Sequence, residues 1–231
     1  MSRLGDLFRD ARKRHKIRRE RPQFWDFPAY GFGYIQIPKV ATRSILRSLG
    51  RLPVRETGEN FDDFESRHSA HVDHGMIRRR VDEGLFVFAF VRDPLERLYS
   101  AWNNKVNRPE DSRNRNIFSC HGMYDRMPFD AFVRRVCELE DREIDRHLRS
   151  QCWFLCDEQG LIPSWVERLE RFADDWQALQ QTFPALPPVP HLNSTAATRI
   201  DHRDALDPEL ARMVVERYRR DYEVFAYPPP V

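Results

Sequence analysis

Hydrophobic residues along the chain gather into two runs with strand character. Residues 85–91 are apolar throughout, as expected of a central strand covered on both faces, and residues 30–37 form a second strand-like run. Helical patterns follow each run, over residues 42–49 up to Gly50 and again from Pro94, where apolar residues recur at helical spacing. The pattern therefore predicts two successive units of strand, turn and helix.

The rest of the chain is predicted to be helix and loop. Residues 71–81 indicate a helix before the second strand, and residues 51–67 a loop or a short helix. Apolar residues from 165 to 183 step by four and three, which by itself predicts one helix, and a last helix begins at Pro208. Residues 107–128, rich in Asn, Arg, Asp and Pro, form a long excursion that we expect on the substrate side of the protein.

Length and charge limit the partners. With 231 residues, 41% of them hydrophobic, we expect one domain over residues 1–231, and a formal net charge of +2 argues against a nucleic-acid partner. The local exception is the basic run 9–21, in an N-terminal arm over residues 1–28, which we interpret as solvated and partly mobile. Contact of this arm with an acidic acceptor or an anionic membrane surface is left open, as is the oligomeric state.

Several classes of protein are disfavoured by what the sequence does not contain. It has no apolar run of about 18 residues and no signal-peptide core, so we expect a cytoplasmic protein without a transmembrane segment. The four cysteines show neither CxxC spacing nor a complete zinc-ligand set, so we expect buried free thiols and no metal. Neither a Walker Gly-Lys-Ser/Thr string nor a dinucleotide-binding glycine fingerprint occurs.

The two strand-to-helix turns are candidate anion sites. Residues 38–44 follow the first strand and residues 92–94 follow the second. A strand that ends in a short turn and opens a helix directs unpaired backbone N–H groups and the positive end of the helix dipole at one spot. Lys39, one of only four lysines among 38 basic residues, lies in the first of these turns. The pattern predicts that each turn binds a phosphate-like group.

These turns also carry the resemblance to a known family. Residues 37–45, Ile-Pro-Lys-Val-Ala-Thr-Arg-Ser-Ile, resemble the 5′-phosphosulfate loop of the sulfotransferases that use 3′-phosphoadenosine 5′-phosphosulfate (PAPS). Residues 88–102 resemble the 3′-phosphate segment of the same family, and this motif is highly specific. Weaker landmarks follow in the same order at residues 150–155, 168–176 and 191–195. The match covers most of the chain and is nearest to the carbohydrate sulfotransferases, of the Golgi type and family 2-like.

The resemblance implies a fold and a reaction. The fold is α/β, in three α/β/α layers with a central parallel sheet, as in P-loop kinases. Residues 165–169 would be a strand followed by a helix, and we adopt this interpretation over the single helix that periodicity predicts. The reaction would move the sulfonate of PAPS, a co-substrate that requires no metal, to a hydroxyl of a carbohydrate or glycoconjugate acceptor.

The resemblance also assigns residues to the donor. Arg92 and Ser100 would hold the 3′-phosphate, and Lys39 would stabilise the charge that builds on the bridging oxygen. The 5′-phosphate would be surrounded by the residues after Lys39, namely Val40, Ala41, Thr42, Arg43 and Ser44. Arg43 departs from the small hydroxyl residue usual at its position, so its role is open between the sulfonate, the acceptor and solvent. Asn193, Ser194 and Thr195 resemble a loop that closes over the nucleotide.

The acceptor hydroxyl needs a base, and histidine is the natural candidate near neutral pH. His68, His71 and His74 lie within seven residues, and the His71-Val72 pair resembles the catalytic region of relatives that sulfate the 2-position of uronic acids. We expect His71 to be the base and keep His68 as the alternative. The opposing interpretation is that these histidines lie on a solvated helix face.

Two other functions are weighed against sulfonate transfer. A nucleotide-dependent phosphotransferase would use the same turns but needs Mg²⁺ and a Walker lysine in a glycine-rich setting. A non-catalytic binding module would bind an acidic polysaccharide through the basic N-terminal arm. Nucleotide binding separates the module from the enzyme.

Overall fold

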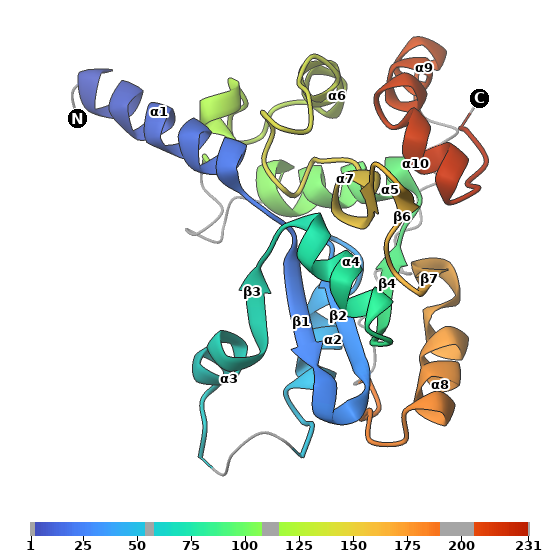
Figure 1. The fold of residues 1–231 in the computed structure, drawn as a ribbon. Helices are drawn as coiled ribbons and strands as arrows, with labels where there is room; N and C mark the ends of the chain where they lie inside the picture. The colour runs from blue at the N-terminus through green and yellow to red at the C-terminus, as the bar shows by residue number, and fades with distance from the viewer. Residues whose placement is uncertain (1–2, 54–57, 108–115, 190–205, 231) are drawn as a thin grey trace. The chain divides into compact units, whose positions relative to one another are not determined.

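The computed structural model describes residues 3–53, 58–107, 116–189 and 206–230, and the chain divides into two compact units (Figure 1). Unit 1 contains Met1–Glu20, Asp93–Trp153 and Ile200–Val231, and unit 2 contains Arg21–Arg92 and Phe154–Arg199. The single-domain organisation stays a prediction. None of the described helices is long and apolar enough to cross a membrane.

Unit 2 is built on a five-stranded sheet in the order β3-β1-β2-β4-β7. The strands are β1 (Gln23–Phe27), β2 (Phe32–Gln36), β3 (Ser69–His71), β4 (Phe86–Val91) and β7 (Trp165–Arg168). β2 pairs with β4 and β4 with β7 in parallel, whereas β1 is antiparallel to both β2 and β3. The α/β class is confirmed, but the sheet is mixed. β2, β3, β4 and β7 all end at one edge of the sheet.

The unexpected strand β1 falls inside the segment that we assigned to a terminal arm. It pairs along its whole length with β2, from Gln23 opposite Gln36 to Phe27 opposite Phe32. Gly33 makes this close packing possible, because a Cβ atom there would lie 2.6 Å from Cζ of Phe24. The arm therefore ends in the interior of the sheet.

Helices flank this sheet and agree in part with the predictions. They are α2 (Thr42–Leu49), α3 (Phe61–His68), α4 (His74–Asp82) and α8 (Phe172–Thr182). In Figure 1, α3 lies beside β3 at one edge and α8 beside β7 at the other. The predicted helix over residues 71–81 is wrong at its start, because His71 pairs with Gln23 in the sheet and Asp73 caps α4 by accepting a hydrogen bond from the Met76 amide. Short 3₁₀ turns precede β2 and α8, at Pro28–Tyr30 and Leu169–Arg171.

An aromatic core explains why periodicity misassigned residues 165–183. Phe90 of β4 contacts Trp165 of β7 at a ring-centroid distance of 5.6 Å and Phe172 of α8 at 4.7 Å. Trp176, one turn later in α8, also lies over Phe90. A strand and a helix thus supply rings to the same core residue at a spacing that imitates one helix. The strand and helix implied by the resemblance are confirmed.

Unit 1 is helical among its described residues. Its α-helices are α1 (Arg3–Arg19), α5 (Pro94–Trp102), α6 (Phe129–Cys137), α9 (Pro208–Arg217) and α10 (Arg219–Val224). A π-helical turn at Asn103–Asn107 and a 3₁₀ turn at Ser119–His121 follow α5. The predicted arm forms the helix α1, and most of its described side chains are exposed, as expected of a solvated segment. It is nevertheless packed near its end, where Ile17 is buried and its carbonyl accepts a 2.5 Å hydrogen bond from Arg149.

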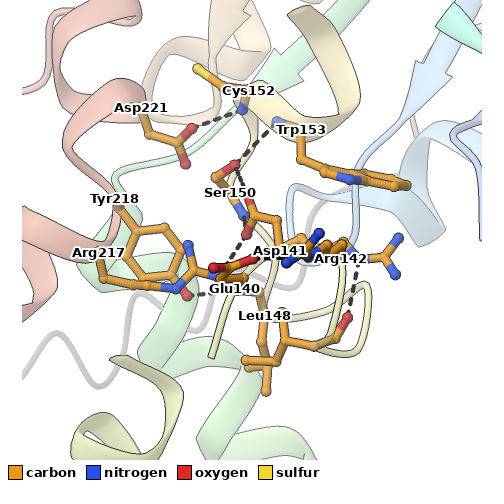
Figure 2. A network of polar contacts seen from close by, with 12 residues as sticks. Glu140, Asp141, Arg142, Leu148, Ser150, Cys152, Trp153, Arg217, Tyr218 and Asp221 are labelled. Carbon is orange, nitrogen blue, oxygen red and sulfur yellow. Dashed lines mark hydrogen bonds and ion pairs between the residues drawn. The ribbon is translucent and has the colours of Figure 1, made fainter. Parts of the chain in front are cut away.

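A polar network joins the loop before residue 153 to the C-terminal helices of unit 1 (Figure 2). The buried Asp221 carboxylate accepts hydrogen bonds from the amides of Gln151, at 2.7 Å, and Cys152, at 2.8 Å. The hydroxyl of Tyr218 donates to the carbonyl of Leu148 at 2.7 Å, and Arg217 donates to Asp141 at 2.6 Å. Burial raises the pKa of Asp221. These bonds fix residues 150–153, the part of the landmark that lies in unit 1, as scaffold of that unit.

The described cysteines agree with the expectation of free thiols. Cys120, Cys152 and Cys156 are buried, Cys137 is partly buried, and none forms a disulfide. Cys156–Asp157 and Gly160–Leu161 form the small hairpin β5-β6.

Candidate active site

In unit 2, the carboxyl ends of β2, β3 and β4 lie along one side of the sheet. The turn with Lys39, Arg92 and His71 follow one another along this side. β2 runs into the turn that contains Lys39, and its parallel neighbour β4 runs into Arg92. On the other side of β2, Gln36 pairs with Gln23 of β1, which in turn pairs with His71 of β3. Adjacent strands are about 4.8 Å apart, so two strand spacings, about 10 Å, separate His71 from Gln36.

The turn after β2 is strained and opens at the N-terminus of α2. Lys39 and Ala41 have φ angles of 74° and 58°, in the left-handed region that non-glycine residues avoid. No side chain caps the α2 N-terminus, where the amides of Ser44 and Ile45 bond back to the Ala41 carbonyl. The first amides of a helix have no intrahelical acceptor, so this turn has donors for an anion.

Side chains support the geometry of this turn. Thr42 donates its hydroxyl to the Ile37 carbonyl at 2.7 Å and so ties the start of α2 to the strand end. Val40 is fully buried, which anchors the middle of the turn, whereas Lys39, Thr42 and Ser44 are partly exposed. Arg43 is exposed, as a residue that reaches acceptor or solvent would be.

The turn after β4 is built differently. Arg92, partly exposed, is the last residue of unit 2, and Asp93 caps α5 by accepting a 3.0 Å hydrogen bond from the Glu96 amide. Pro94 at the first helical position has no N–H to offer, and the Arg97 amide bonds to the Asp93 carbonyl at 2.8 Å. Few backbone donors are therefore left in this turn, so an anion bound here would depend on the side chain of Arg92.

His71 is exposed at the end of β3, and its ring orientation is set by the backbone. Its Nδ1 lies 3.0 Å from the carbonyl oxygen of Arg21. A carbonyl only accepts hydrogen bonds, so Nδ1 carries the proton and Nε2 keeps its lone pair for a second partner. The side chain of Arg21 is held by Asp73 at 2.9 Å, which fixes the segment that orients the ring. In the neutral tautomer with this orientation, Nε2 is the nitrogen that can accept a proton.

His68 has different surroundings. It ends α3, and its ring stacks on Phe27 at 5.1 Å and contacts Phe64 at 4.9 Å. Phe27 pairs with Phe32 at the start of β2, so His68 lies toward the edge of the sheet opposite the two turns. Burial lowers the pKa of His68, which disfavours its charged form. Because His68 lies at the end of the sheet away from the two turns, His71 stays the predicted base.

Four of the residues expected to contact PAPS are not part of this row. Ser100 is partly exposed in α5 and belongs to unit 1, whereas Arg92 belongs to unit 2. Asn193, Ser194 and Thr195 lie outside the described residues. Their roles stay predictions.

Sequence reasoning missed two residues at this edge. Arg168 ends β7 opposite Val91 and places a second arginine one strand beyond β4. Gln23, between His71 and Gln36, is buried and bonds through its amide nitrogen to Glu65 at 2.6 Å. Arg168 begins the landmark at residues 168–176 but was given no role there, and Gln23 belongs to no motif. Strand pairing over long sequence distances brings both to this edge. Among the described residues, no group of three or more His, Cys, Asp or Glu side chains is arranged to hold a metal ion.

Comparison with known proteins points in the same direction. Residues 22–228 match the model of the Sulfotransferase family. The chain is 26% identical over 225 residues to carbohydrate sulfotransferase 14 of Mus musculus and to that of Homo sapiens, with 87% of this chain and 59% of each relative covered. It thus spans about three fifths of the length of these curated relatives, and no solved structure matches.

The family match includes both turns, the sheet edge and His71, and it extends over most of the chain. Strand pairing places the two motifs at the ends of the adjacent parallel strands β2 and β4. The chain therefore belongs to the sulfotransferase family.

Proposed function

We propose that this protein transfers the sulfonate of PAPS to a hydroxyl of a carbohydrate acceptor and releases adenosine 3′,5′-bisphosphate. The observation that carries the proposal is the placement of the Lys39 turn and Arg92 at the ends of two parallel, hydrogen-bonded strands. The curated relatives are named carbohydrate sulfotransferases, which supports a carbohydrate as the acceptor.

The residues present fit a donor with two separate anionic groups. The uncapped α2 N-terminus suits the 5′-phosphosulfate, because backbone donors and the helix dipole act there together. Arg92, whose planar fork suits phosphate, suits the 3′-phosphate. When bound, PAPS supplies an activated sulfonyl group and a bisphosphate leaving group.

Lys39 and His71 would divide the chemical work. Lys39, held at a left-handed φ of 74° in the first turn, would place its ammonium against the oxygen on which negative charge develops. His71 would accept the proton of the acceptor hydroxyl at Nε2, because Nδ1 is committed to the Arg21 carbonyl. The first residue lowers the cost of charge on the leaving side, and the second raises the nucleophilicity of the attacking side.

Calorimetry of nucleotide binding tests the proposal. Arg92→Ala should weaken binding of adenosine 3′,5′-bisphosphate by about tenfold or more, the effect of losing a charge-assisted contact, and leave AMP binding nearly unchanged. The matched control is Arg79→Ala, an exposed arginine of α4. Equal losses for both nucleotides in Arg92→Ala would contradict the assignment of the 3′-phosphate.

The two alternatives predict different outcomes in the same experiment. A non-catalytic module would bind an acidic polysaccharide but neither nucleotide. A phosphotransferase would bind ATP with Mg²⁺ at least as tightly as the bisphosphate. Transfer of label from ³⁵S-labelled PAPS to a panel of glycans, measured without added metal, would then identify the acceptor class.

A further inference from the structure

The pairing between β1 and β3 continues beyond the two strands, toward the segment that orients His71. Inside the sheet, Gln23 lies opposite His71. One position further, the Val72 amide donates to the Pro22 carbonyl at 3.0 Å, in the same register. Proline has no N–H, so it cannot return the second hydrogen bond of an antiparallel pair. Backbone pairing therefore weakens next to the point where the orientation of His71 is set.

An ion pair between side chains takes the next position in this register. Continued by one residue, the register places Arg21 opposite Asp73. Nη1 of Arg21 lies 2.9 Å from Oδ2 of Asp73. The carbonyl oxygen of the same Arg21 lies 3.0 Å from Nδ1 of His71. Arg21 thus contacts Asp73 through its side chain and His71 through its backbone, so the ion pair helps to set the position of the carbonyl.

Asp73 uses its two carboxylate oxygens for different partners. Oδ2 contacts Arg21, and Oδ1 accepts a 2.9 Å hydrogen bond from the Met76 amide, which caps α4. Both side chains of the ion pair are more than half exposed, and an isolated exposed ion pair contributes little stability. Here the cap already fixes the rotamer of the carboxylate, so the ion pair does not have to order it.

The helix that carries Asp73 at its start is itself held firmly within unit 2. Arg80 of α4 donates two hydrogen bonds of 3.0 Å to the carboxylate of Asp26 in β1. Arg78 of α4 donates at 2.9 and 2.7 Å to the carboxylate of Asp157 in the β5-β6 hairpin. Bidentate arginine–carboxylate pairs of this kind fix geometry as well as adding energy. They therefore fix α4, and with it the cap residue.

The tautomer of His71 decides which nitrogen can act as a base. In a neutral imidazole, the hydrogen bond made by one ring nitrogen determines the state of the other. Free histidine side chains in water favour the proton on Nε2. With the Arg21 carbonyl in place, Nδ1 carries the proton instead, and Nε2 is the acceptor. Displacement of this carbonyl would return the ring to the tautomer in which Nε2 is blocked by its own proton.

We propose that Asp73 and the side chain of Arg21 are positioning residues for His71, which hold the Arg21 carbonyl where it selects the Nδ1–H tautomer. Both act through the imidazole ring and not on the reacting atoms. The inference rests on the proposed function for the role of His71 as the base, and it adds the contacts that keep the ring in the competent form.

NMR of the full chain labelled with ¹⁵N-histidine tests the contact, because the ring nitrogens have different ¹⁵N shifts in the two tautomers. Spectra are taken at about pH 8, where an ordinary histidine is neutral, and His71→Gln identifies the signals of this ring. The wild type should show the Nδ1–H tautomer. Asp73→Ser, which keeps a cap for α4 but has a single oxygen, and Arg21→Ala, which keeps the carbonyl, should both shift the ring toward the Nε2–H tautomer.

Turnover should fall with the competent fraction of the ring. With ³⁵S-labelled PAPS and p-nitrophenyl β-galactoside as the acceptor, each variant should lower kcat by about three- to tenfold and leave KM for PAPS unchanged, because only molecules with Nε2 free react. The double variant should be no slower than the slower single variant, since both changes break the same contact. The matched control, Asp207→Ala, removes the cap of α9 in unit 1 and should change neither the tautomer nor kcat.

Three outcomes would overturn the proposal. These are a His71 tautomer that is the same in the wild type, Asp73→Ser and Arg21→Ala, losses of kcat that add up in the double variant, or an equal loss of kcat in Asp207→Ala. The NMR result does not depend on catalysis. If His71→Ala kept its turnover, the proposed base would be wrong, while the tautomer would still show whether Asp73 and Arg21 orient the ring. The two failures are therefore distinguishable.

Discussion

The turns after β2 and β4 look alike in sequence but are built on different principles. The turn after β2 leaves the N-terminus of α2 without a side-chain cap and holds Lys39 and Ala41 at positive φ. The turn after β4 is capped by Asp93 and begins its helix with Pro94. Backbone donors are thus available in the first turn, and the second relies on the Arg92 side chain. The first turn presents its backbone donors in a strained conformation. The second turn is stabilised by its cap and presents a charged side chain.

The largest effect is expected at His71, which is separated from the end of β2 by β1. His71→Ala should lower turnover by about two to four orders of magnitude and leave affinity for adenosine 3′,5′-bisphosphate unchanged, because it removes only the proton acceptor. Steady-state kinetics and calorimetry measure the two quantities. His68→Ala is the control, since it should lower the melting temperature through lost packing on Phe27 and Phe64 but keep turnover. The reverse result would move the base to His68.

Lys39 should come next, as the charge of the first turn. Lys39→Ala should lower turnover by about 10²- to 10³-fold, the usual cost of one lost group that stabilises developing charge. Lys105→Ala is the matched control in kinetics with a small alcohol acceptor, because Lys105 lies in the π-helical turn Asn103–Asn107 of unit 1. Turnover of Lys39→Ala within a factor of three of the wild type would refute a role in the transfer step.

The second turn should respond in stability. Asp93→Ala should lower the free energy of unfolding by about 1 kcal/mol, because the Glu96 amide loses its cap. Urea denaturation measures the loss, and Asp93→Asn, which also accepts a hydrogen bond, should recover most of it. An unchanged unfolding free energy in Asp93→Ala would show that this cap does not stabilise the turn.

The smallest effect is expected when the strain of the first turn is relieved. Ala41→Gly should change the free energy of unfolding by less than about 0.5 kcal/mol, because glycine removes the left-handed strain and adds freedom to the unfolded chain. Affinity for adenosine 3′,5′-bisphosphate should fall a few-fold, since the donors are less preorganised. A gain in affinity would mean that the strain does not serve binding.

The sequence predicted the parts of the fold that are local. The apolar runs at residues 30–37 and 85–91 predict β2 and β4. Gly50 marks the end of α2, and Pro94 marks the start of α5. β1 was hidden, because five residues of mixed polarity next to a basic run carry no strand pattern. β3 was hidden because three residues become a strand only through pairing with β1.

The candidate site, like the fold, was predictable only where its residues follow a local sequence pattern. Lys39 and Arg92 were visible because each follows a clear strand. His71 came from the resemblance, and its ring orientation, set by a carbonyl 50 positions away in sequence, had no signal in the local pattern. The Asp93-Pro94 pair indicates a helix cap from the sequence alone. Sequence reasoning overlooked that this cap competes with a bound anion for the amides at the start of α5.

β1 has a consequence for acceptor choice. Because it is hydrogen-bonded along one side to β2 and along the other to β3, it holds the end of β3, with His71, at a fixed distance from the end of β2. In the proposed reaction this distance would separate the proton acceptor from the leaving group. A loop in its place would let the gap widen or narrow with each substrate. With this fixed separation, only an acceptor hydroxyl that reaches His71 and the transferred sulfonate at the same time would react. The width of one strand would then contribute to regioselectivity as much as any pocket.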